Sequence, residues 1–316
     1  MKKGAIIALV VAIVLILIGG TVLVLGLSFA GEAKDTVTMV TESEISIQDS
    51  FDNVLIDTED CNVDIVLFEG AADPHVVLKE RDRTSHSVLV EDGTLKIRMV
   101  DNRTWKDHIG VTWESMEMTV YLPQKEYTSV RITTATGQIR IPGEFSAQEM
   151  VLRSDTGKIS CVGVNGGVLD CMTSTGDISV RSSAPTLTKL QSSTGDLEVS
   201  VVAGDEMHLK TSTGDVDAEK VNAGLFTCSS STGEVDLEGV LAEDYLQIRT
   251  DSGEVSIENC DAGRVDIETD TGDVEGHFLT PKWFSAHSDT GNIKVPNTSE
   301  GGECRIETDT GDIRFE

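Results

Sequence analysis

The sequence predicts an all-β protein, a parallel β-solenoid of 19–20-residue coils that follows a single N-terminal transmembrane helix. A phrase of the Thr-Gly-Asp type recurs in tandem, and its glycines are spaced 19 or 20 residues apart, a fixed period that is typical of solenoids. Apolar and polar residues alternate on both sides of each glycine, as in half-buried strands. The repeat glycines are Gly137, Gly157, Gly176, Gly195, Gly214, Gly233, Gly253, Gly272, Gly291 and Gly311.

The first thirty residues differ in composition from the rest. An uncharged apolar run over 5–27 follows Lys2 and Lys3, and about 20 apolar residues suffice to cross a bilayer. The run exceeds the ~7–15-residue core of a cleavable signal peptide, although Ser28-Phe29-Ala30 leaves cleavage as an alternative. Because lysines precede the run and acidic residues follow it, the positive-inside rule predicts a single-pass protein of the cell membrane. Its parts are a cytoplasmic stub (1–4), a transmembrane helix (5–27), a linker (28–48) and an extracytoplasmic C-terminal domain (49–316).

The chain is strongly acidic, with 54 Asp and Glu against 25 Lys and Arg and a net charge of −29. Proteins that bind nucleic acids present basic faces, so no nucleic-acid partner is expected. Acidic chains that lack apolar periodicity are often disordered. The alternation described above favours a soluble, self-repelling ectodomain instead.

Each regular repeat predicts two short strands joined at the glycine. Around Gly214, for example, Leu209 and Val216 fall on the inward side of the pleat, and so does Thr211. The position three before the glycine is Thr or Ser in every repeat. A column of buried hydroxyls is tolerable only if coils lie directly over one another, so that the hydroxyls bond along the stack or to the turns. Residues 129–316 are therefore predicted to form regular coils about 4.8 Å apart, with right-handed crossovers.

The triplet Asp289-Thr290-Gly291 is also the tripeptide of aspartic proteases. A two-carboxylate site needs two copies held face to face, whereas ten tandem copies indicate turn chemistry. The glycine permits the chain reversal, and the aspartate that follows, such as Asp273, is expected to face water at the bend. No catalytic residue is predicted.

Residues 49–128 fit the same pattern less regularly. If Cys61 takes the glycine position, then Val54, Ile56 and Thr58 fall on inward positions. Residues 92–97 fit the second half of a coil, and 101–115 is the largest insertion. These residues are therefore predicted to be irregular early coils of the solenoid.

At this point the chain resembles a bacterial family of β-strand-repeat membrane proteins, the "putative adhesin" domain-of-unknown-function family, some of whose members are encoded beside envelope-stress sensors. The resemblance rests on the Thr-Gly-Asp-Val coils, on DGTLKI at 92–97 and on MTVYLPQKEYTSVRITTATGQI at 118–139. It covers about residues 49–316. It implies a surface location and an adhesive or envelope-stress role, and no known activity.

The six cysteines are predicted to be buried free thiols, because their register places them on inward or corner columns. Only Cys161 and Cys171, in neighbouring coils on opposite walls, are close enough to test for a disulfide. The six histidines form no metal-ligand spacing, and nucleotide-binding and hydrolase motifs are missing. No cofactor is predicted.

The acidic residues near the C-terminal glycines are the one candidate cation site. Stacked coils would place them in two rows of like charge, with about 4.8 Å between neighbours. Weak Ca²⁺ binding is one expectation for such rows, and diffuse screening by salt is the other. The candidate residues are Asp251, Glu254, Asp270, Asp273, Asp289, Asp309 and Asp312.

Three functions are compatible with this sequence. The first is a structural or adhesive role at the cell surface, with an extended surface, cell-wall or membrane-protein partner. The second is an envelope-stress accessory that modulates a membrane sensor; because the predicted cytoplasmic stub is so short, it would act through contacts in or outside the membrane. The third is a polysaccharide-acting enzyme, which would need basic and aromatic groups beside its carboxylates; the chain has only three Trp and three Tyr. We therefore expect a non-enzymatic protein.

Overall fold

The computed structural model describes residues 40–70, 72–81, 83–102 and 115–316. The predicted stub and helix, and the linker up to residue 39, lie outside these residues. Within the described part of the chain, no helix is long and apolar enough to cross a membrane.

The described residues form 24 strands. In chain order they are β1 (Val40–Ser46), β2 (Asn53–Asp57), β3 (Cys61–Phe68), β4 (His75–Arg81), β5 (Thr84–Glu91), β6 (Thr94–Asp101), β7 (Met116–Pro123), β8 (Glu126–Thr134), β9 (Ile139–Ile141), β10 (Phe145–Thr156), β11 (Ile159–Val162), β12 (Val164–Thr175), β13 (Ile178–Thr194), β14 (Leu197–Ala203), β15 (Glu206–Lys210), β16 (Val216–Thr232), β17 (Val235–Glu238), β18 (Leu241–Ser252), β19 (Val255–Thr271), β20 (Val274–Phe278), β21 (Lys282–Thr290), β22 (Ile293–Lys294), β23 (Gly302–Thr310) and β24 (Ile313–Phe315).

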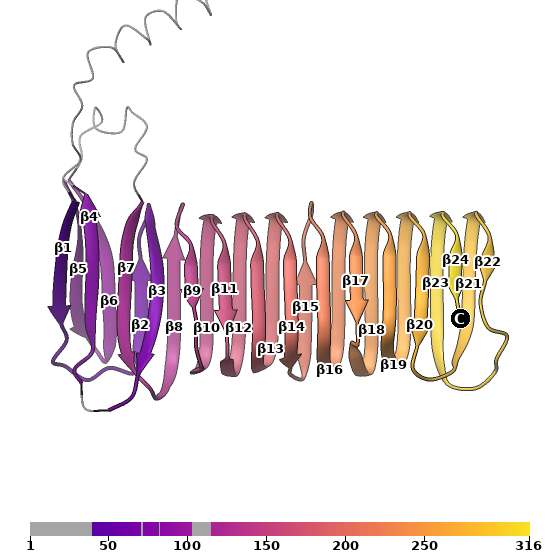
Figure 1. Cartoon of the computed structure of the whole chain (residues 1–316), viewed down its shortest axis with the longest axis horizontal. Coiled ribbons are helices and arrows are strands. Elements are labelled where there is room, and N and C mark those ends of the chain that lie inside the picture. Colours follow the sequence, from indigo (N-terminus) through magenta and orange to yellow (C-terminus); the bar gives the residue numbers. More distant parts are fainter. Residues whose placement is uncertain (1–39, 71, 82, 103–114) are drawn as a thin grey trace, which may run out of the picture. The chain divides into compact units, whose positions relative to one another are not determined.

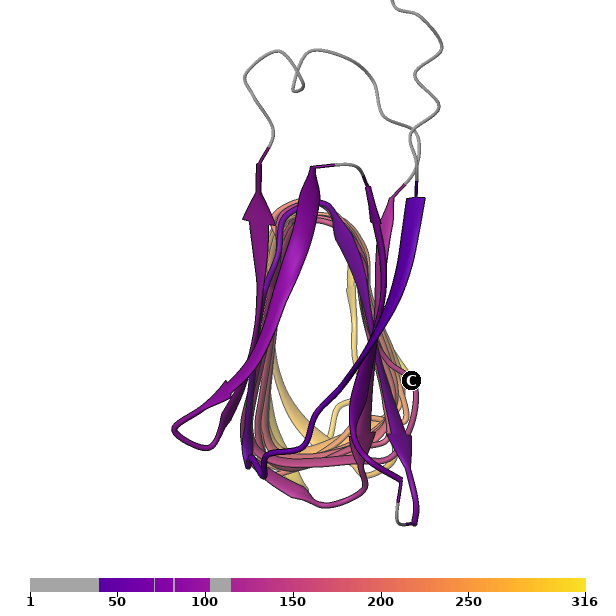
Figure 2. The same ribbon diagram turned by 90° about the vertical axis from the view of Figure 1, so that its left-hand side faces the viewer.

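The regular part is a parallel β-solenoid in which each coil lies in register on its neighbours (Figure 1). Strand β14, for example, pairs in parallel with β13 and β16, so that Val199 lies opposite Val180 on one side and Ala218 on the other. Figure 2, which looks along the stack, shows the coils superposed as one flattened ring with two facing walls. The predicted all-β parallel solenoid is confirmed.

The inward columns of the two walls form one continuous core. Leu209 and Ile248 on one wall, and Val216 and Val235 on the other, are at most 2% exposed. Burial of such columns drives the stacking, because an isolated coil would leave its apolar residues in water. The predicted inward position of Thr211 is also correct, since it is 2% exposed whereas the preceding Lys210 is exposed.

Beyond the second wall each coil turns through a residue with positive φ. Ser182 (49°), Val201 (56°), Lys220 (54°), Gly239 (65°) and Asn259 (55°) occupy this place in consecutive coils. Valine and lysine rarely adopt this conformation, so the residue types give little sign of the turn. The turn is imposed by the pairing of the coils on either side.

The first coil in the sequence is formed by β2 and β3. Val54 and Ile56 of β2 lie opposite Val130 and Ile132 of β8, and Val63 of β3 lies opposite Ile139 of β9. The prediction that Cys61 takes a glycine position is therefore confirmed, across a separation of 76 residues from Gly137. The prediction for residues 92–97 is wrong in one respect. They belong to the first half of a coil, because Leu95 and Ile97 of β6 pair with β2.

Antiparallel strands cover the N-terminal end of the stack. Strand β5 pairs with β6, β4 pairs with β7, and β1 pairs with β4, all antiparallel. The hairpin between β5 and β6 turns at Asp92-Gly93, where both residues have positive φ, the usual chemistry of a tight hairpin. The sequence predicts a linker over 28–48, but Val40–Ser46 forms β1 of this cap.

The spatial order of the coils departs from the sequence order at both ends. At the N-terminal end β6 and β7 lie outside β2 and β3. At the C-terminal end the last strands in the sequence, β23 and β24, lie between β19 and β20 on one side and β21 and β22 on the other. The expected stack, in which each coil lies on the previous one, is corrected here. The outermost coil contains β21 and β22 (Figure 1).

All six cysteines are free and buried, as the register predicts. Contact with the Cys161 thiol, together with burial, raises the pKa of Cys171 well above its usual value. Desolvation also raises the pKa of Cys228 to about 12. Cys171 and Cys228 are therefore protonated core residues.

Candidate functional site

The glycine edge is the line of turns that contain the repeat glycines. A Cβ added to Gly214 would collide with the carbonyl oxygen of Gly195, and one added to Gly195 would collide with that of Gly176. The φ of Gly214 is also 142°, a conformation that side chains disfavour. Glycine therefore lets one turn pack directly on the next. This close approach is the physical reason for the repeated triplet.

Buried hydroxyls link each coil to the turn of its neighbour. The Oγ1 of Thr211 donates a hydrogen bond to the carbonyl oxygen of Gly195 (3.0 Å), and the Oγ of Ser230 donates to that of Gly214 (3.2 Å). The hydroxyls thus bond to turn carbonyls, and not to one another along the column. The column is incomplete, because the buried Oγ1 atoms of Thr250 and Thr269 have no partner.

This difference predicts different costs for the same substitution. Thr211→Val should lower the free energy of unfolding by about 1–3 kcal/mol, because it removes a buried hydrogen bond and leaves a turn carbonyl unsatisfied. Thr250→Val should be nearly neutral or stabilising, because the hydroxyl it removes is buried without a partner. Urea titrations of the two variants measure both effects. Equal losses would show that the hydroxyl-to-carbonyl bonds contribute nothing.

The carboxylates that follow the glycines also connect neighbouring coils. The backbone N–H of Asp215 donates to Oδ1 of Asp196 (2.9 Å), and the N–H of Glu234 donates to Oδ1 of Asp215 (2.8 Å). The expectation that these aspartates only face water is therefore too simple. One carboxylate oxygen replaces water as the acceptor for a turn amide. The spacing gave no sign of this role, which depends on the approach of two coils.

The predicted acidic rows lie on this edge, but they do not carry uniform unfavourable charge. Partial burial, and then the nearby carboxylates of Glu275 and Glu234, raise the pKa of Glu254. The pKa of Asp312 is lowered, because the backbone N–H of Asn292 donates to it and Arg314 pairs with it. The end of the row is therefore neutralised, and only its middle is crowded.

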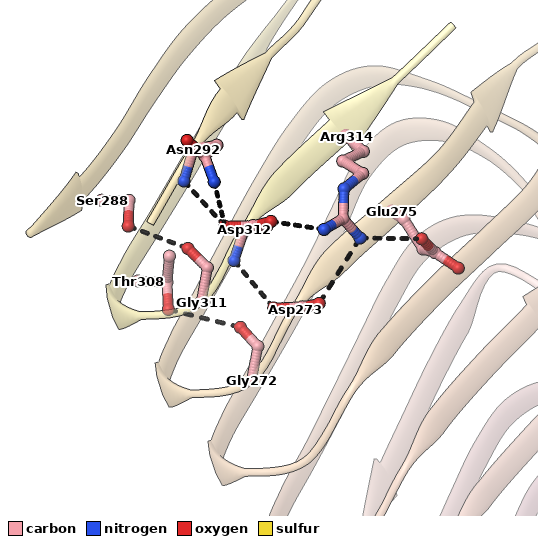
Figure 3. Close-up of polar contacts among 9 residues, drawn as sticks. All are labelled: Gly272, Asp273, Glu275, Ser288, Asn292, Thr308, Gly311, Asp312 and Arg314. Carbon is pink, nitrogen blue, oxygen red and sulfur yellow. Dashed lines mark hydrogen bonds and ion pairs between the residues drawn. The ribbon is translucent and has the colours of Figure 1, made fainter. Parts of the chain in front are cut away.

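Figure 3 shows how the reordered C-terminal coils create this neutral end. The backbone N–H of Asp312 donates to Oδ1 of Asp273 (2.8 Å), and Oδ1 of Asp312 in turn accepts the N–H of Asn292 (2.7 Å). The guanidinium of Arg314 pairs with Asp312, lies 3.5 Å from Asp273 and lies 3.7 Å from Glu275. One guanidinium thus lies within ion-pair distance of three carboxylates.

The raised pKa of Glu254 and the lowered pKa of Asp312 predict opposite changes in stability when each charge is removed. Glu254→Gln should raise the melting temperature at pH 7 and low salt, because a carboxylate with a raised folded pKa destabilises the fold when it is charged. The gain should shrink with added salt, and should vanish as the pH falls below the ordinary glutamate range.

Asp312→Asn is the control on the same edge. It should lower the melting temperature at neutral pH, because its carboxylate stabilises the fold above the unfolded pKa, and this contribution is lost as pH falls through the lowered folded pKa. Shifts of the same sign in both variants at pH 7 would refute the division of the row into a crowded and a neutralised part.

Within the described ranges, no group of three or more His, Cys, Asp or Glu side chains is placed to hold a metal ion. Weak calcium binding by the acidic rows stays a prediction. Melting curves in chelator and in millimolar Ca²⁺ at matched ionic strength would measure it, with a higher melting temperature in calcium as the expected sign.

A groove runs along the far edge, at the opposite end of each coil from the glycines. It has a volume of about 1040 Å³ and crosses consecutive coils. Small residues such as Ala203, Gly204 and Ala223 line it, with the carboxylates of Asp205, Glu206, Glu243 and Asp244. Of the described residues that line it, none is basic. The sequence pattern does not indicate this groove, although the small residues recur near the ends of the coils.

A second hollow of about 420 Å³ continues from Leu241 and Glu243 towards the C-terminal coils. Its one basic lining residue, Lys282, is already neutralised. The Lys282 ammonium, with only 2% of its side chain exposed, pairs with Asp261 and donates to the carbonyl oxygen of Ala262 (2.8 Å) and to Oγ1 of Thr280 (3.0 Å). The far edge therefore presents its negative charge mainly in the larger groove, where Glu206 has His208 as a neighbour (3.4 Å).

A hydroxyl, an imidazole and a carboxylate meet at the N-terminal end. Nε2 of His86 lies 2.8 Å from Oγ1 of Thr58, and Nδ1 of His86 lies 2.9 Å from Oε1 of Glu80. This order of groups can activate a nucleophile, but Thr58 is 4% exposed and the His86 side chain is fully buried. Thr58 occupies the hydroxyl column, and His86 supplies the partner that a turn carbonyl supplies elsewhere. The cluster therefore fits a capping role.

The solved structures similar to this chain include a "putative adhesin" from Bacteroides fragilis (12% identity, 88% of this chain and 97% of that chain covered, TM-score 0.45). Another is a "putative lipid binding protein" from Parabacteroides distasonis (18% identity, 75% and 96% covered, TM-score 0.48). A third is a "putative adhesin" from Parabacteroides merdae (13% identity, 75% and 95% covered, TM-score 0.46).

No curated protein matches the chain. The model of one family matches it over residues 44–238 and 207–316, which is nearly all of the described solenoid. The chain belongs to the Toastrack family, DUF4097.

Proposed function

We propose that this protein is a membrane-anchored, extracytoplasmic binding protein with an adhesive role at the cell surface. The observation that carries the proposal is the far-edge groove, which crosses several coils and is lined by small residues and carboxylates. A groove along a stack of coils suits a partner that is itself extended, because successive coils line it at steps of about 4.8 Å. The apolar run over 5–27 supports the anchor.

The charge of the groove indicates the chemistry of the partner. Asp205, Glu206, Glu243 and Asp244 line it together, and the described lining residues include no lysine or arginine. A partner with regularly spaced positive charges, such as an extended basic peptide segment, would neutralise these carboxylates. An enzymatic role is less favoured, because carboxylates that act on sugars work beside aromatic and basic groups, and the lining residues provide neither.

The groove can be tested with decalysine as the probe and the full-length chain in detergent. Binding measured by calorimetry should weaken at least ten-fold when Asp205→Asn, Glu243→Gln and Asp244→Asn are combined. The matched control removes three carboxylates from the glycine edge, with Asp251→Asn, Asp270→Asn and Asp309→Asn. Equal weakening in both triple variants would show non-specific attraction to an acidic protein and would remove the groove from the proposal.

The proposed topology has its own test. Protease added to intact cells should digest the solenoid, because only the stub and the helix would be shielded by the membrane. A tag at the C-terminus, followed by immunoblotting, reports the digestion. Survival of the tag in intact cells, with loss only after lysis, would place the solenoid in the cytoplasm.

A further inference from the structure

The C-terminal end of the solenoid is an open edge. Strand β21 pairs only with β23, and β22 pairs only with β24, so within the described chain the outer side of this coil has no neighbouring strand. The N-terminal end differs, because antiparallel strands cover it. An open edge offers a row of backbone donors and acceptors for another strand.

Inward-facing apolar side chains that are buried in the other described coils become exposed in this coil. Val255, Val274 and Ile313 are fully buried, whereas Ile293, the last member of the same column, is 44% exposed. Phe284 is likewise only partly buried, although its equivalent Cys304 in the next coil is fully buried. The exposure arises because these side chains lack the coil that would cover them.

The apolar patch of this coil comprises Ile293 and Trp283, which are exposed, and Phe284, which is partly buried. The rings that contact Phe284, those of Phe278 and Phe315, are themselves buried. The ring of Phe284 packs 5.4 Å from that of Phe315, and Phe315 stacks 5.3 Å from Phe278. Trp283, on the outer face of β21, is 49% exposed. Aromatic residues at the centre of an apolar patch are typical of protein interfaces.

The charge of this coil identifies the partner. Residues 282–301 carry two acidic residues, Asp289 and Glu300, and one exposed lysine, Lys294, because Lys282 is buried against Asp261. The adjacent coil, 302–316, carries five acidic residues and two arginines, in a chain whose net charge is −29. Two copies of so acidic a protein repel one another at most surfaces. At the open coil that repulsion is weakest, because two acidic residues stand there against one exposed lysine.

We propose that the open coil, defined by β21 and β22, is a docking surface for a second copy of this chain. The two copies meet tail to tail about a two-fold axis, which pairs the edge strands antiparallel and covers both apolar patches with the same surface. The segment 103–114 is excluded as the occupant, because it connects β6 and β7 at the other end of the stack. Each copy then covers the exposed inward-facing side chains of the other copy's outermost coil.

Tail-to-tail pairing leaves the two N-terminal caps at opposite ends of the pair. Together with the membrane anchor of the proposed function, this arrangement would join copies on two facing membranes. The docking itself does not depend on the anchor or on the groove, so it can fail or succeed independently of the proposed function.

The mass of the full-length chain in detergent, measured by sedimentation over micromolar concentrations, tests the docking. The expected mass is that of two chains. Ile293→Lys should weaken the pairing about 30-fold or more, because it places a charge in the apolar patch. Val201→Lys is the matched control. It makes the same kind of change at a site that is 53% exposed, distant from the open coil, and at the positive-φ turn position that Lys220 occupies in the neighbouring coil. It should leave the dimer intact.

Circular dichroism and melting curves establish that both variants are folded. A dimeric wild type with a monomeric, folded Ile293→Lys variant supports the proposal. A monomeric wild type, an Ile293→Lys variant that still dimerises, or an equal loss of dimer in both variants would overturn it. A dimer held through residues 1–39 would appear as the second of these results.

Discussion

Gly214→Ala is expected to destabilise the solenoid by on the order of 4 kcal/mol, the largest effect of any single added methyl group considered. The Cβ would collide with the backbone carbonyl of Gly195, and neither turn can retreat without losing its contacts with the coils on either side. The left-handed φ of Gly214 adds strain of about 1–3 kcal/mol, and overpacking adds a similar amount. Urea unfolding of the full-length variant, followed by circular dichroism, measures the loss.

Gly143→Ala is the matched control for this prediction. An added Cβ at Gly143 would meet no atom within 4 Å, and its φ lies outside the positive range that strains other residues. The substitution should be neutral or slightly stabilising, since alanine restricts the unfolded chain. A loss of stability in Gly143→Ala as large as that in Gly214→Ala would mean that turn packing is not the reason for glycine.

Lys282→Met should have the second largest effect and lower the free energy of unfolding by about 2–4 kcal/mol. Methionine keeps most of the buried volume but removes the ammonium, so the Asp261 carboxylate and the Ala262 carbonyl lose their donor in a largely dry site. The lower part of the range allows for the partial exposure of Asp261. Lys282 begins β21 but bonds to β19, two coils away, so it holds the outermost coil to the body of the solenoid.

Hydrogen exchange separates this mechanism from a general loss of stability. Protection should fall first in β21 and β23, while that of β10 to β13 should be retained, because coils contact only their neighbours. Lys282→Met combined with Asp261→Leu should recover part of the loss, since no uncompensated charge is then buried. Uniform loss of protection along the whole stack would contradict the inference that the Lys282–Asp261 pair holds mainly the outermost coil in place.

The same pair predicts a dependence on pH. Burial acts to raise the pKa of Asp261, but hydrogen bonds from Lys282 and Thr280 outweigh it, and the pKa is lowered. The stabilising contribution of this carboxylate is therefore present above the ordinary aspartate pKa and is lost as the pH falls through the lowered value. In acid the wild type should approach the stability of Lys282→Met. A constant gap between them down to the lowest pH would contradict this assignment.

The period and the alternation were sufficient to predict the coils, because both reflect local requirements. A strand buried on one side must alternate, and turns packed as closely as those of the regular coils favour glycine. The alternation of its flanking residues alone allowed Cys61 to be placed in a glycine position, 76 residues before Gly137. The role of Asp215 could not be predicted in the same way, because its carboxylate accepts an N–H from a residue in the next coil.

Sequence by itself therefore determined the composition of each coil: its two strands, its inward columns with Thr211 among them, and its glycine turn. Only the tertiary structure decided which coil lies beside which. All coils share nearly the same inward pattern, so β19 can pair with β23 as well as with β21, and the alternation does not distinguish these choices. That choice leaves Ile293 at an open end, aligns Arg314 with three carboxylates and brings Lys282 to Asp261. Such sites depend on contacts between coils, and a pattern that repeats in every coil carries no information about them.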